Sequence, residues 1–207
     1  MSLNKRPATG ERRQQILQML AEMLQMPAVE KITTAALAAR LDVSEAALYR
    51  HFASKAQMFE GLIEFIEQTL FTLLNRIADS QESGVAQLEA MLLVLLGFAE
   101  KNPGMARVLT GEALVHENER LQVRINQLVD RIEATLRQAL RIATAQQEIN
   151  IPQVNATANL LLCFVVGRWQ LYVKSGFRRQ PAADYADIWG LLHVMLGSCR
   201  DANSALP

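Results

Sequence analysis

The sequence predicts an all-α protein with eight or nine helices, and three features support this fold class. Glycine and proline are few, at 10 and 6 of 207 residues, and half of all residues are hydrophobic. Residues of high helix propensity (Leu, Ala, Gln, Glu and Arg) dominate the sequence. Apolar residues recur at three- and four-residue spacing and not in the alternation typical of strands. We expect the helices to form a small N-terminal part and a larger body.

A polar arm precedes the first two expected helices. The first spans about residues 11–25, where leucine and isoleucine share one face, and Pro27 follows its end. Thr33 is placed to cap a second helix over about residues 34–41, because a threonine hydroxyl can accept a hydrogen bond from the first helical turn.

A third short helix follows a tight turn at Asp42. Ser44 is placed to cap this helix, which spans about residues 45–51. Two helices of fewer than about ten residues, joined by so short a turn, match a helix-turn-helix, whose second helix enters the major groove of DNA. The spacing therefore predicts a DNA-binding domain at the N-terminal end.

The rest of the chain is expected to form longer helices separated by turn-forming residues. Ser54 and Gln57 have the spacing of a capping box, which opens a long helix to about residue 78. Further helices are expected at about residues 85–101, 103–110, 113–145, 153–175 and 182–200.

Charge is distributed unevenly along a chain whose formal net charge is zero. Residues 1–58 contain eight of the 21 Lys/Arg and five of the 21 Asp/Glu, so the remainder is acidic. A basic head is typical of a protein that binds a polyanion. No signal peptide or apolar segment of membrane length is evident. We expect a soluble cytoplasmic protein with Cys163 and Cys199 as buried free thiols.

Tyr49, Arg50 and His51 lie together at the end of the third expected helix. Tyr49 and Arg50 face outward on this helix, where tyrosine can donate to phosphate and arginine can pair with phosphate or a guanine edge. The alternative is a solvated helix end, but the helix-turn-helix spacing and the nearby basic residues favour DNA. The residues predicted to contact DNA are Lys31, Thr33, Thr34, Ser44, Glu45, Ala46, Tyr49, Arg50, His51 and Lys55.

The segment "ITTAALAARLDVSEAALYRHFASKAQMFEGLIEFI" resembles the N-terminal DNA-binding domain of the TetR family of bacterial regulators. Asp42 stands where the family usually has glycine, and aspartate tolerates a left-handed turn. The resemblance implies a helix-turn-helix domain with its arm over residues 1–54 and a helical regulatory and dimerisation domain over residues 55–207. It also implies a homodimer that binds a pseudo-palindromic site in double-stranded DNA.

Segments of the body, including "LLGFAEKNPGMARVLTGEAL", resemble the nucleoid occlusion branch of this family. Members of that branch bind dispersed chromosomal sites and, while bound to DNA, antagonise the division protein FtsZ. The resemblance implies an FtsZ-binding surface that includes Phe65, Gly97, Lys101 and Asn102. Leu73 and Lys101 stand where the branch usually has arginine, and lysine does not replace arginine at a bidentate contact.

The last two expected helices carry large apolar side chains. In TetR-like proteins the corresponding helices form a four-helix bundle with the partner chain. This assigns to the dimer interface Phe164, Trp169, Trp189, Leu192 and Met195. The alternative is that these side chains fill the core of a single chain, and some of them serve in both ways.

Two further function classes compete with nucleoid occlusion. A ligand-responsive TetR repressor would bind a small-molecule effector in its body. Met91, Phe98, Met105 and Phe164 are candidates to line such a pocket, but they serve equally as core residues. An enzyme is disfavoured, because the sequence offers no nucleophile–base pair, metal cluster or glycine-rich phosphate loop. The segment around His116 begins like a zinc-protease motif but has no second histidine. We therefore expect no catalytic residue, no metal and no cofactor.

Overall fold

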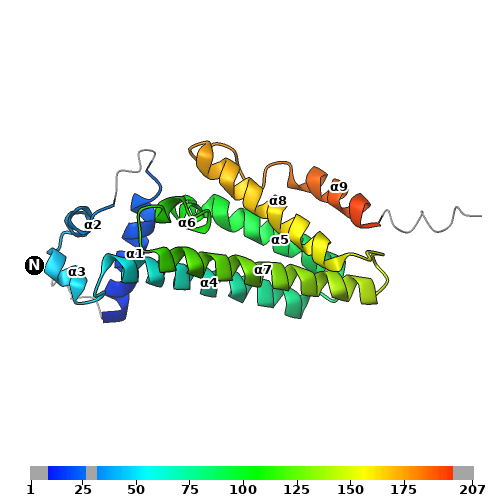
Figure 1. Ribbon diagram of the computed structural model, residues 1–207, viewed down its shortest axis with the longest axis horizontal. Helices are drawn as coiled ribbons and strands as arrows, with labels where there is room; N and C mark the ends of the chain where they lie inside the picture. Colours follow the sequence, from blue (N-terminus) through cyan, green and yellow to red (C-terminus); the bar gives the residue numbers. More distant parts are fainter. Residues whose placement is uncertain (1–8, 27–31, 198–207) are drawn as a thin grey trace, which may run out of the picture. The chain divides into compact units, whose positions relative to one another are not determined.

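The computed structural model describes residues 9–26 and 32–197, and these residues are predominantly helical (Figure 1). In chain order the helices are α1 (Thr9–Met23), α2 (Thr34–Arg40), α3 (Glu45–Tyr49), α4 (Lys55–Ser80), α5 (Gly84–Lys101), α6 (Pro103–Leu109), the 3-10 turn η1 (Glu112–Leu114), α7 (Glu119–Ala145), α8 (Val154–Lys174) and α9 (Tyr185–Gly197). No strand occurs within the two described ranges. The predicted all-α class is confirmed.

The chain divides into two compact units. Unit 1 comprises Met1–Ile66 and Asn102–Ile125, and unit 2 comprises Glu67–Lys101 and Asn126–Pro207. Helix α6 therefore groups with the three N-terminal helices. The expected domain boundary after residue 54 lies within unit 1, at the start of α4.

Side-chain caps fix the two short helices of the helix-turn-helix. The backbone N–H of Ala36 donates to Thr33 Oγ1 at 3.1 Å, and the N–H of Ala47 donates to Ser44 Oγ at 3.2 Å. Asp42, in the turn between the helices, has a φ of 53°. Aspartate is one of the few residues other than glycine that tolerate this left-handed conformation. Both predicted caps and the predicted turn are confirmed.

Helix α4 begins at the predicted capping box and buries a continuous apolar stripe. Ser54 Oγ accepts from the N–H of Gln57 at 3.2 Å, while Gln57 Oε1 accepts from the N–H of Ala53 at 2.8 Å. The stripe of fully buried side chains consists of Phe59, Leu62, Ile63, Ile66, Leu70 and Leu74. Burial of each such side chain contributes about 1.5–3 kcal/mol. Because the stripe continues along the helix, this burial stabilises α4 over its 26 residues.

The helix expected over residues 113–145 is wrong at its start. The structure has the short turn η1 and then α7, separated by an irregular stretch at residues 115–118. Asn118 Oδ1 accepts from the N–H of Arg120 at 3.1 Å, and the acidic Glu119 lies in the first turn. An acidic first turn stabilises a helix start, so Asn118 and Glu119 mark the beginning of α7. The apolar spacing continues across this point and therefore predicts one uninterrupted helix.

In unit 2, α8 packs against α5 through a buried face, and buried side chains of α8 and α9 donate hydrogen bonds to carbonyls of α5. Trp169 Nε1 donates to the carbonyl of Leu95 at 3.0 Å, Tyr172 Oη to that of Glu100 at 3.1 Å, and Tyr185 Oη to that of Glu89 at 2.6 Å. Burial, and secondarily a nearby glutamate carboxylate, raises the pKa of both tyrosines.

Helix α8 is also long and apolar enough to cross a membrane by length and composition alone. It is the one helix in the described part of the chain that meets this test. Part of this apolar character is buried in the packing on α5, and part lies on an exposed side that includes Leu160 and Leu171. Cys163 lies on the exposed side, so the expectation that it is buried is wrong for the single chain. Cys199 lies outside the described residues.

Candidate nucleic-acid interface

Helix α3 presents the polar residues that the sequence predicts to meet DNA. Leu48 is buried on its inner side, and Phe52, just beyond its end, is also buried under the guanidinium of Arg13, 4.4 Å from the ring centroid. These two anchors fix the orientation of the short helix. The opposite side is exposed and consists of Glu45, Ala46, Tyr49 and Arg50.

A chain of hydroxyl contacts joins the starts of α2 and α3. Thr34 Oγ1 donates to Glu45 Oε2 at 2.6 Å, and Tyr49 Oη donates to Thr34 Oγ1 at 3.5 Å. The structure thus brings together three of the predicted DNA-contacting residues from two helices. Tyr49 remains 45% exposed, and its long hydrogen bond leaves the hydroxyl available to exchange threonine for a phosphate oxygen.

Arg50 supplies a cation at the end of α3. Its side chain is exposed and has no hydrogen-bond or ion-pair partner among the described residues. An arginine without an intramolecular partner can bind phosphate or a guanine edge without first breaking a contact. His51, the next residue, is half-buried.

Lys55 is engaged within the protein. Its Nζ forms an ion pair with Glu117, beyond η1, and lies 5.7 Å from the ring centroid of Phe59. Sequence reasoning missed Glu117, because 62 residues separate the partners. Lys31, the remaining predicted contact, lies outside the described residues, as does the arm.

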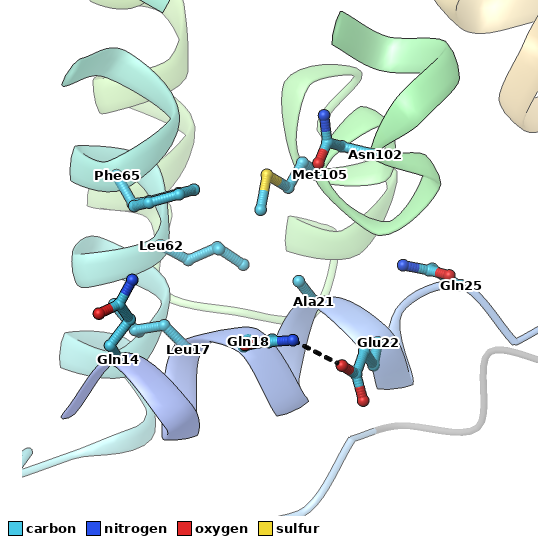
Figure 2. Close-up of a pocket in the computed structure, with 10 residues that line it drawn as sticks. All are labelled: Gln14, Leu17, Gln18, Ala21, Glu22, Gln25, Leu62, Phe65, Asn102 and Met105. Atoms are coloured by element: carbon cyan, nitrogen blue, oxygen red, sulfur yellow. Dashed lines mark hydrogen bonds between the residues drawn. The ribbon is translucent and has the colours of Figure 1, made fainter. Parts of the chain in front are cut away.

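Unit 1 also contains an open groove of about 280 Å³ between α1, α4 and α6 (Figure 2). Phe65 and Leu62 on α4 and Met105 on α6 point into it, while glutamines of α1 line its edge. The full lining is Gln14, Leu17, Gln18, Ala21, Glu22, Gln25, Leu62, Phe65, Asn102 and Met105. An apolar floor with an amide rim can bury apolar side chains and hydrogen-bond a peptide backbone.

The four residues expected to bind FtsZ are divided between the units. Phe65 and Asn102 line the groove of unit 1. Gly97 and Lys101 lie on α5 in unit 2, with Lys101 exposed and open space where a Cβ of Gly97 would project. Sequence reasoning missed the contribution of α1 to the groove.

Helices α8 and α9 present an exposed apolar face. Leu191 and Val194 on α9 are 72% and 65% exposed, and Leu160 and Leu171 on α8 are also exposed. Gly167 and Gly190 leave open space beside these side chains, so another helix can approach closely. Exposed apolar side chains at helical spacing on two consecutive helices are typical of a protein interface.

The predicted dimerisation residues occupy both sides of these helices. Trp169 and Trp189 are buried in the core of the single chain, which is the alternative left open for them, because their rings pack inward. Phe164 and Leu192 are half-buried, and Met195 is exposed on α9.

The residues expected to line an effector pocket do not form one set. Met91 and Phe98 are buried on α5, and Phe164 is half-buried on α8. Met105 belongs to unit 1, where it lines the groove. Within the described residues, no group of three or more His, Cys, Asp or Glu side chains is arranged to hold a metal ion.

Two family models match the chain and agree with this architecture. The model described as "Bacterial regulatory proteins, tetR family" matches residues 16–62, which contain the helix-turn-helix. The model described as SlmA-like, "Tetracyclin repressor-like, C-terminal domain", matches residues 82–197, more than half of the chain. The two models together define a DNA-binding regulator of the TetR type.

Curated relatives narrow the assignment within that class. The nucleoid occlusion factor SlmA of Marinomonas sp. (strain MWYL1) is 50% identical over 184 residues, covering 88% of this chain and 93% of the relative. The nucleoid occlusion factor SlmA of Vibrio cholerae serotype O1 is 48% identical, covering 89% and 95%. The chain belongs to the TetR family and, within it, to the SlmA branch.

Solved structures of lower identity share the fold. FadR of Bacillus subtilis in complex with stearoyl-CoA has a TM-score of 0.71 at 15% identity, covering 86% of this chain and 96% of that one. AibR in complex with isovaleryl coenzyme A and operator DNA has a TM-score of 0.69 at 19% identity, covering 89% and 97%. The TetR-like architecture is thereby confirmed.

Proposed function

We propose that the protein is a homodimeric nucleoid occlusion factor that binds dispersed pseudo-palindromic sites on the chromosome and antagonises FtsZ there. The carrying observation is the 46–50% identity to SlmA proteins over about nine-tenths of the chain, in the regulatory domain as well as the head. The protein acts in the cytoplasm, at the nucleoid, through binding and without catalysis.

The outward side of α3 supports the DNA-binding part of the proposal. Tyr49 offers a hydroxyl donor, and Arg50 a guanidinium with no partner in the described part of the chain, at a helix held by Leu48 and Phe52. Phosphate contacts position such a helix, and base-edge contacts give it sequence preference. Arg50 and Tyr49 carry these roles, with Thr33, Thr34 and Ser44 at the helix starts beside them.

The exposed apolar face of α8 and α9 supports the homodimer. A pseudo-palindromic site requires two recognition helices to reach half-sites about 34 Å apart or a multiple of that distance. A second copy of the face defined by Leu160, Leu171, Leu191 and Val194 covers it and supplies the second helix.

The groove of unit 1 supports the FtsZ contact. Phe65, expected from the family resemblance to meet FtsZ, lies in the groove beside the amides of α1. Phe65→Ala is expected to abolish the effect on FtsZ polymers, measured by light scattering with bound DNA, and to leave DNA affinity unchanged. Val123→Ala, at an exposed residue of α7, is the control. Unchanged antagonism by Phe65→Ala contradicts this use of the groove.

The departures at Leu73 and Lys101 provide a second test of the same contact. Arginine offers a planar fork of donors to an acidic partner, which neither leucine nor lysine provides. Leu73→Arg with Lys101→Arg is therefore expected to strengthen FtsZ antagonism at equal DNA occupancy. A weaker effect contradicts the assignment of these positions to the contact.

Chromosome-wide mapping of bound sites by crosslinking and sequencing in the native host tests the proposal as a whole. Nucleoid occlusion predicts many dispersed sites that are sparse near the replication terminus and unrelated to promoters. One or a few sites at promoters would instead identify a transcriptional repressor and direct the search toward an effector.

A further inference from the structure

Arg107, on α6, is the only buried cationic side chain within the described ranges, with 4% of its surface exposed. Burial of a charge is costly unless the charge is paired and hydrogen-bonded. The cost of placing an arginine here is therefore offset by specific contacts. Direct DNA contact does not explain this arginine, because a guanidinium with 4% of its surface exposed cannot reach the backbone or groove of a duplex.

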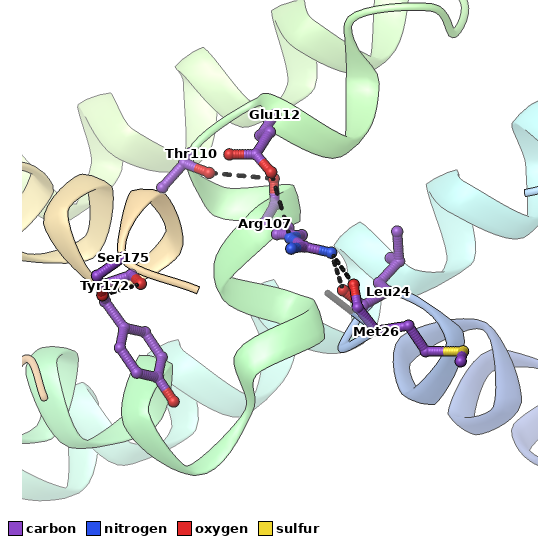
Figure 3. A network of polar contacts seen from close by, with 7 residues as sticks. All are labelled: Leu24, Met26, Arg107, Thr110, Glu112, Tyr172 and Ser175. Atoms are coloured by element: carbon purple, nitrogen blue, oxygen red, sulfur yellow. Dashed lines mark hydrogen bonds and ion pairs between the residues drawn. The ribbon is translucent and has the colours of Figure 1, made fainter. Parts of the chain in front are cut away.

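The contacts of Arg107 converge on the end of α1 (Figure 3). Its Nη1 donates to the carbonyl of Leu24 at 2.8 Å and to that of Met26 at 2.7 Å. Its Nε lies 3.3 Å from Oε1 of Glu112. The carbonyl of Leu24 follows the last residue of α1, where carbonyls lack partners within the helix and carry partial negative charge, so the guanidinium caps α1 there and also holds the chain just beyond it at Met26.

Gly104, one turn before Arg107, allows α6 to approach α1 this closely. A Cβ at residue 104 would lie 1.9 Å from the carbonyl oxygen of Ala21 and 2.9 Å from its carbonyl carbon. These are backbone atoms, so any side chain forces the two helices apart. Gly104 and Arg107 together form a surface of α6 fitted to α1, which we call the α6 clamp.

The α6 clamp extends to the helix-turn-helix through Met26. The carbonyl of Met26 accepts from Arg107, and its Sδ accepts from Nη2 of Arg40, the last residue of α2, at 3.0 Å. Helix α1 also packs directly on α2. Met26, three residues beyond the end of α1, therefore contacts both α6 and the first helix of the DNA-binding motif.

We propose that Arg107 is a positioning residue for DNA recognition: by holding the end of α1, the α6 clamp fixes the orientation in which the helix-turn-helix presents α3 to a half-site. Arg107 acts through Leu24 and Met26, not on DNA itself. This inference rests on the DNA binding proposed above. It adds that DNA recognition requires the α6 clamp as well as the exposed residues of α2 and α3.

Arg107→Gln, Arg107→Lys and Gly104→Ala are compared with wild type as full-length proteins. The DNA probes are the site of highest occupancy mapped for wild type, the same half-sites moved apart by one or two base pairs, and a scrambled duplex. Arg137→Gln is the matched control, because Arg137 is a half-buried arginine paired with Glu133 in unit 2. Thermal unfolding and oligomeric state are measured for every variant.

We expect Arg107→Gln to lose about tenfold or more of its affinity for the mapped site, and to lose the preference for native spacing, while scrambled DNA is bound as by wild type. Arg107→Lys retains the charge without the fork, so it recovers stability but only part of the spacing preference. Arg137→Gln lowers stability and leaves spacing preference intact. If Arg107→Gln does not fold, Arg107→Lys and Gly104→Ala decide by the same readouts.

The inference is overturned if the folded Arg107 and Gly104 variants bind DNA with wild-type affinity and wild-type spacing preference. It is also overturned if none of the three variants folds, because the α6 clamp then has only a structural role. Absence of any site preference in wild type would overturn the DNA-binding proposal itself, which is a distinguishable result.

Discussion

Two exposed surfaces of this chain differ in chemistry: one is polar and the other apolar. This difference indicates that they bind different kinds of partner. The surface of α2 and α3 carries hydroxyls, a carboxylate and a guanidinium, each on a helix whose inner side is fully buried. The face of α8 and α9 carries leucine, valine and methionine beside glycines with open space. The polar surface can exchange its hydrogen bonds for hydrogen bonds to a phosphate. The apolar face is stabilised only when another apolar surface covers it and removes it from water.

The comparison also concerns how each surface is held. The two short helices that carry the polar surface begin and turn through local contacts within a few residues, namely the caps of Thr33 and Ser44 and the turn at Asp42. The apolar face depends on tertiary packing, because Trp169, Tyr172 and Tyr185 attach its helices to carbonyls of α5. A local device is readable in the sequence, whereas a tertiary attachment is not.

Breaking the apolar face is expected to have the largest effect. Leu191→Glu with Val194→Glu places two charges in the interface, so the chain becomes monomeric and one head binds one half-site. Loss of the linked second contact reduces DNA affinity by about 10²–10⁴-fold. Sedimentation equilibrium and DNA titration measure the two consequences. Val115→Glu, at a residue equally exposed outside the face, is the control. A dimer that survives the double substitution contradicts the assignment.

Removing the outward cation of α3 is expected to have the next largest effect. Arg50→Ala loses a contact worth about 1–3 kcal/mol, or roughly 5- to 150-fold in affinity for the mapped site, without a change in unfolding temperature. Tyr49→Ala weakens binding to scrambled and mapped DNA alike if its hydroxyl meets phosphate. Arg76→Ala, at an exposed arginine of α4, controls for net charge. Unchanged affinity in both α3 variants removes α3 as the recognition helix.

Removing the Ser44 cap tests whether the polar surface depends on local contacts. Ser44→Ala leaves the N–H of Ala47 without its acceptor and lowers the free energy of unfolding by about 0.5–2 kcal/mol. DNA affinity falls with it, because α3 is only five residues long and depends on its cap. Ser80→Ala at the end of α4 is the matched serine. Calorimetry and hydrogen exchange of the α3 amides measure the change, and equal effects at both serines would count against a special role for Ser44.

The smallest effect on DNA binding is expected at Lys55, and it distinguishes an internal ion pair from a DNA contact. Its partner Glu117 is part of unit 1, and each side chain is largely but not fully buried. Lys55→Gln and Glu117→Gln should therefore each lower stability by about 1–3 kcal/mol, because each leaves a largely buried charge without its partner, with little change in the salt dependence of DNA binding. A shallower salt slope for Lys55→Gln alone would restore Lys55 to the DNA surface.

The sequence was sufficient where the governing contacts are local. Thr33 and Ser44 cap helices whose donors lie three residues away, and the periodicity of α4 identifies its own buried stripe. The start of α7 was missed because Leu114 and Leu121 continue the apolar spacing across a break that only the cap at Asn118 reveals.

Contacts between distant residues could not be predicted. Arg107 reaches the carbonyl of Leu24 across 83 residues, and Glu117 reaches Lys55 across 62. Neither partner has a spacing that singles it out, since a buried arginine and a surface arginine look alike in a sequence. The groove has the same origin: the resemblance names Phe65 and Asn102 as contact residues, but the sequence predicts neither the groove nor the wall that α1 forms.

The burial of both tryptophans has a spectroscopic consequence. Trp169 and Trp189 are the only tryptophans in the chain, and both lie in unit 2, one of them with its indole N–H bonded to a backbone carbonyl. Tryptophan emission therefore reports the environment of α8 and α9. Helices α2 and α3 contribute no such fluorophore, so a head that unfolds early leaves that signal unchanged. If tryptophan emission and far-ultraviolet circular dichroism show the same unfolding transition, the molecule unfolds as one cooperative unit.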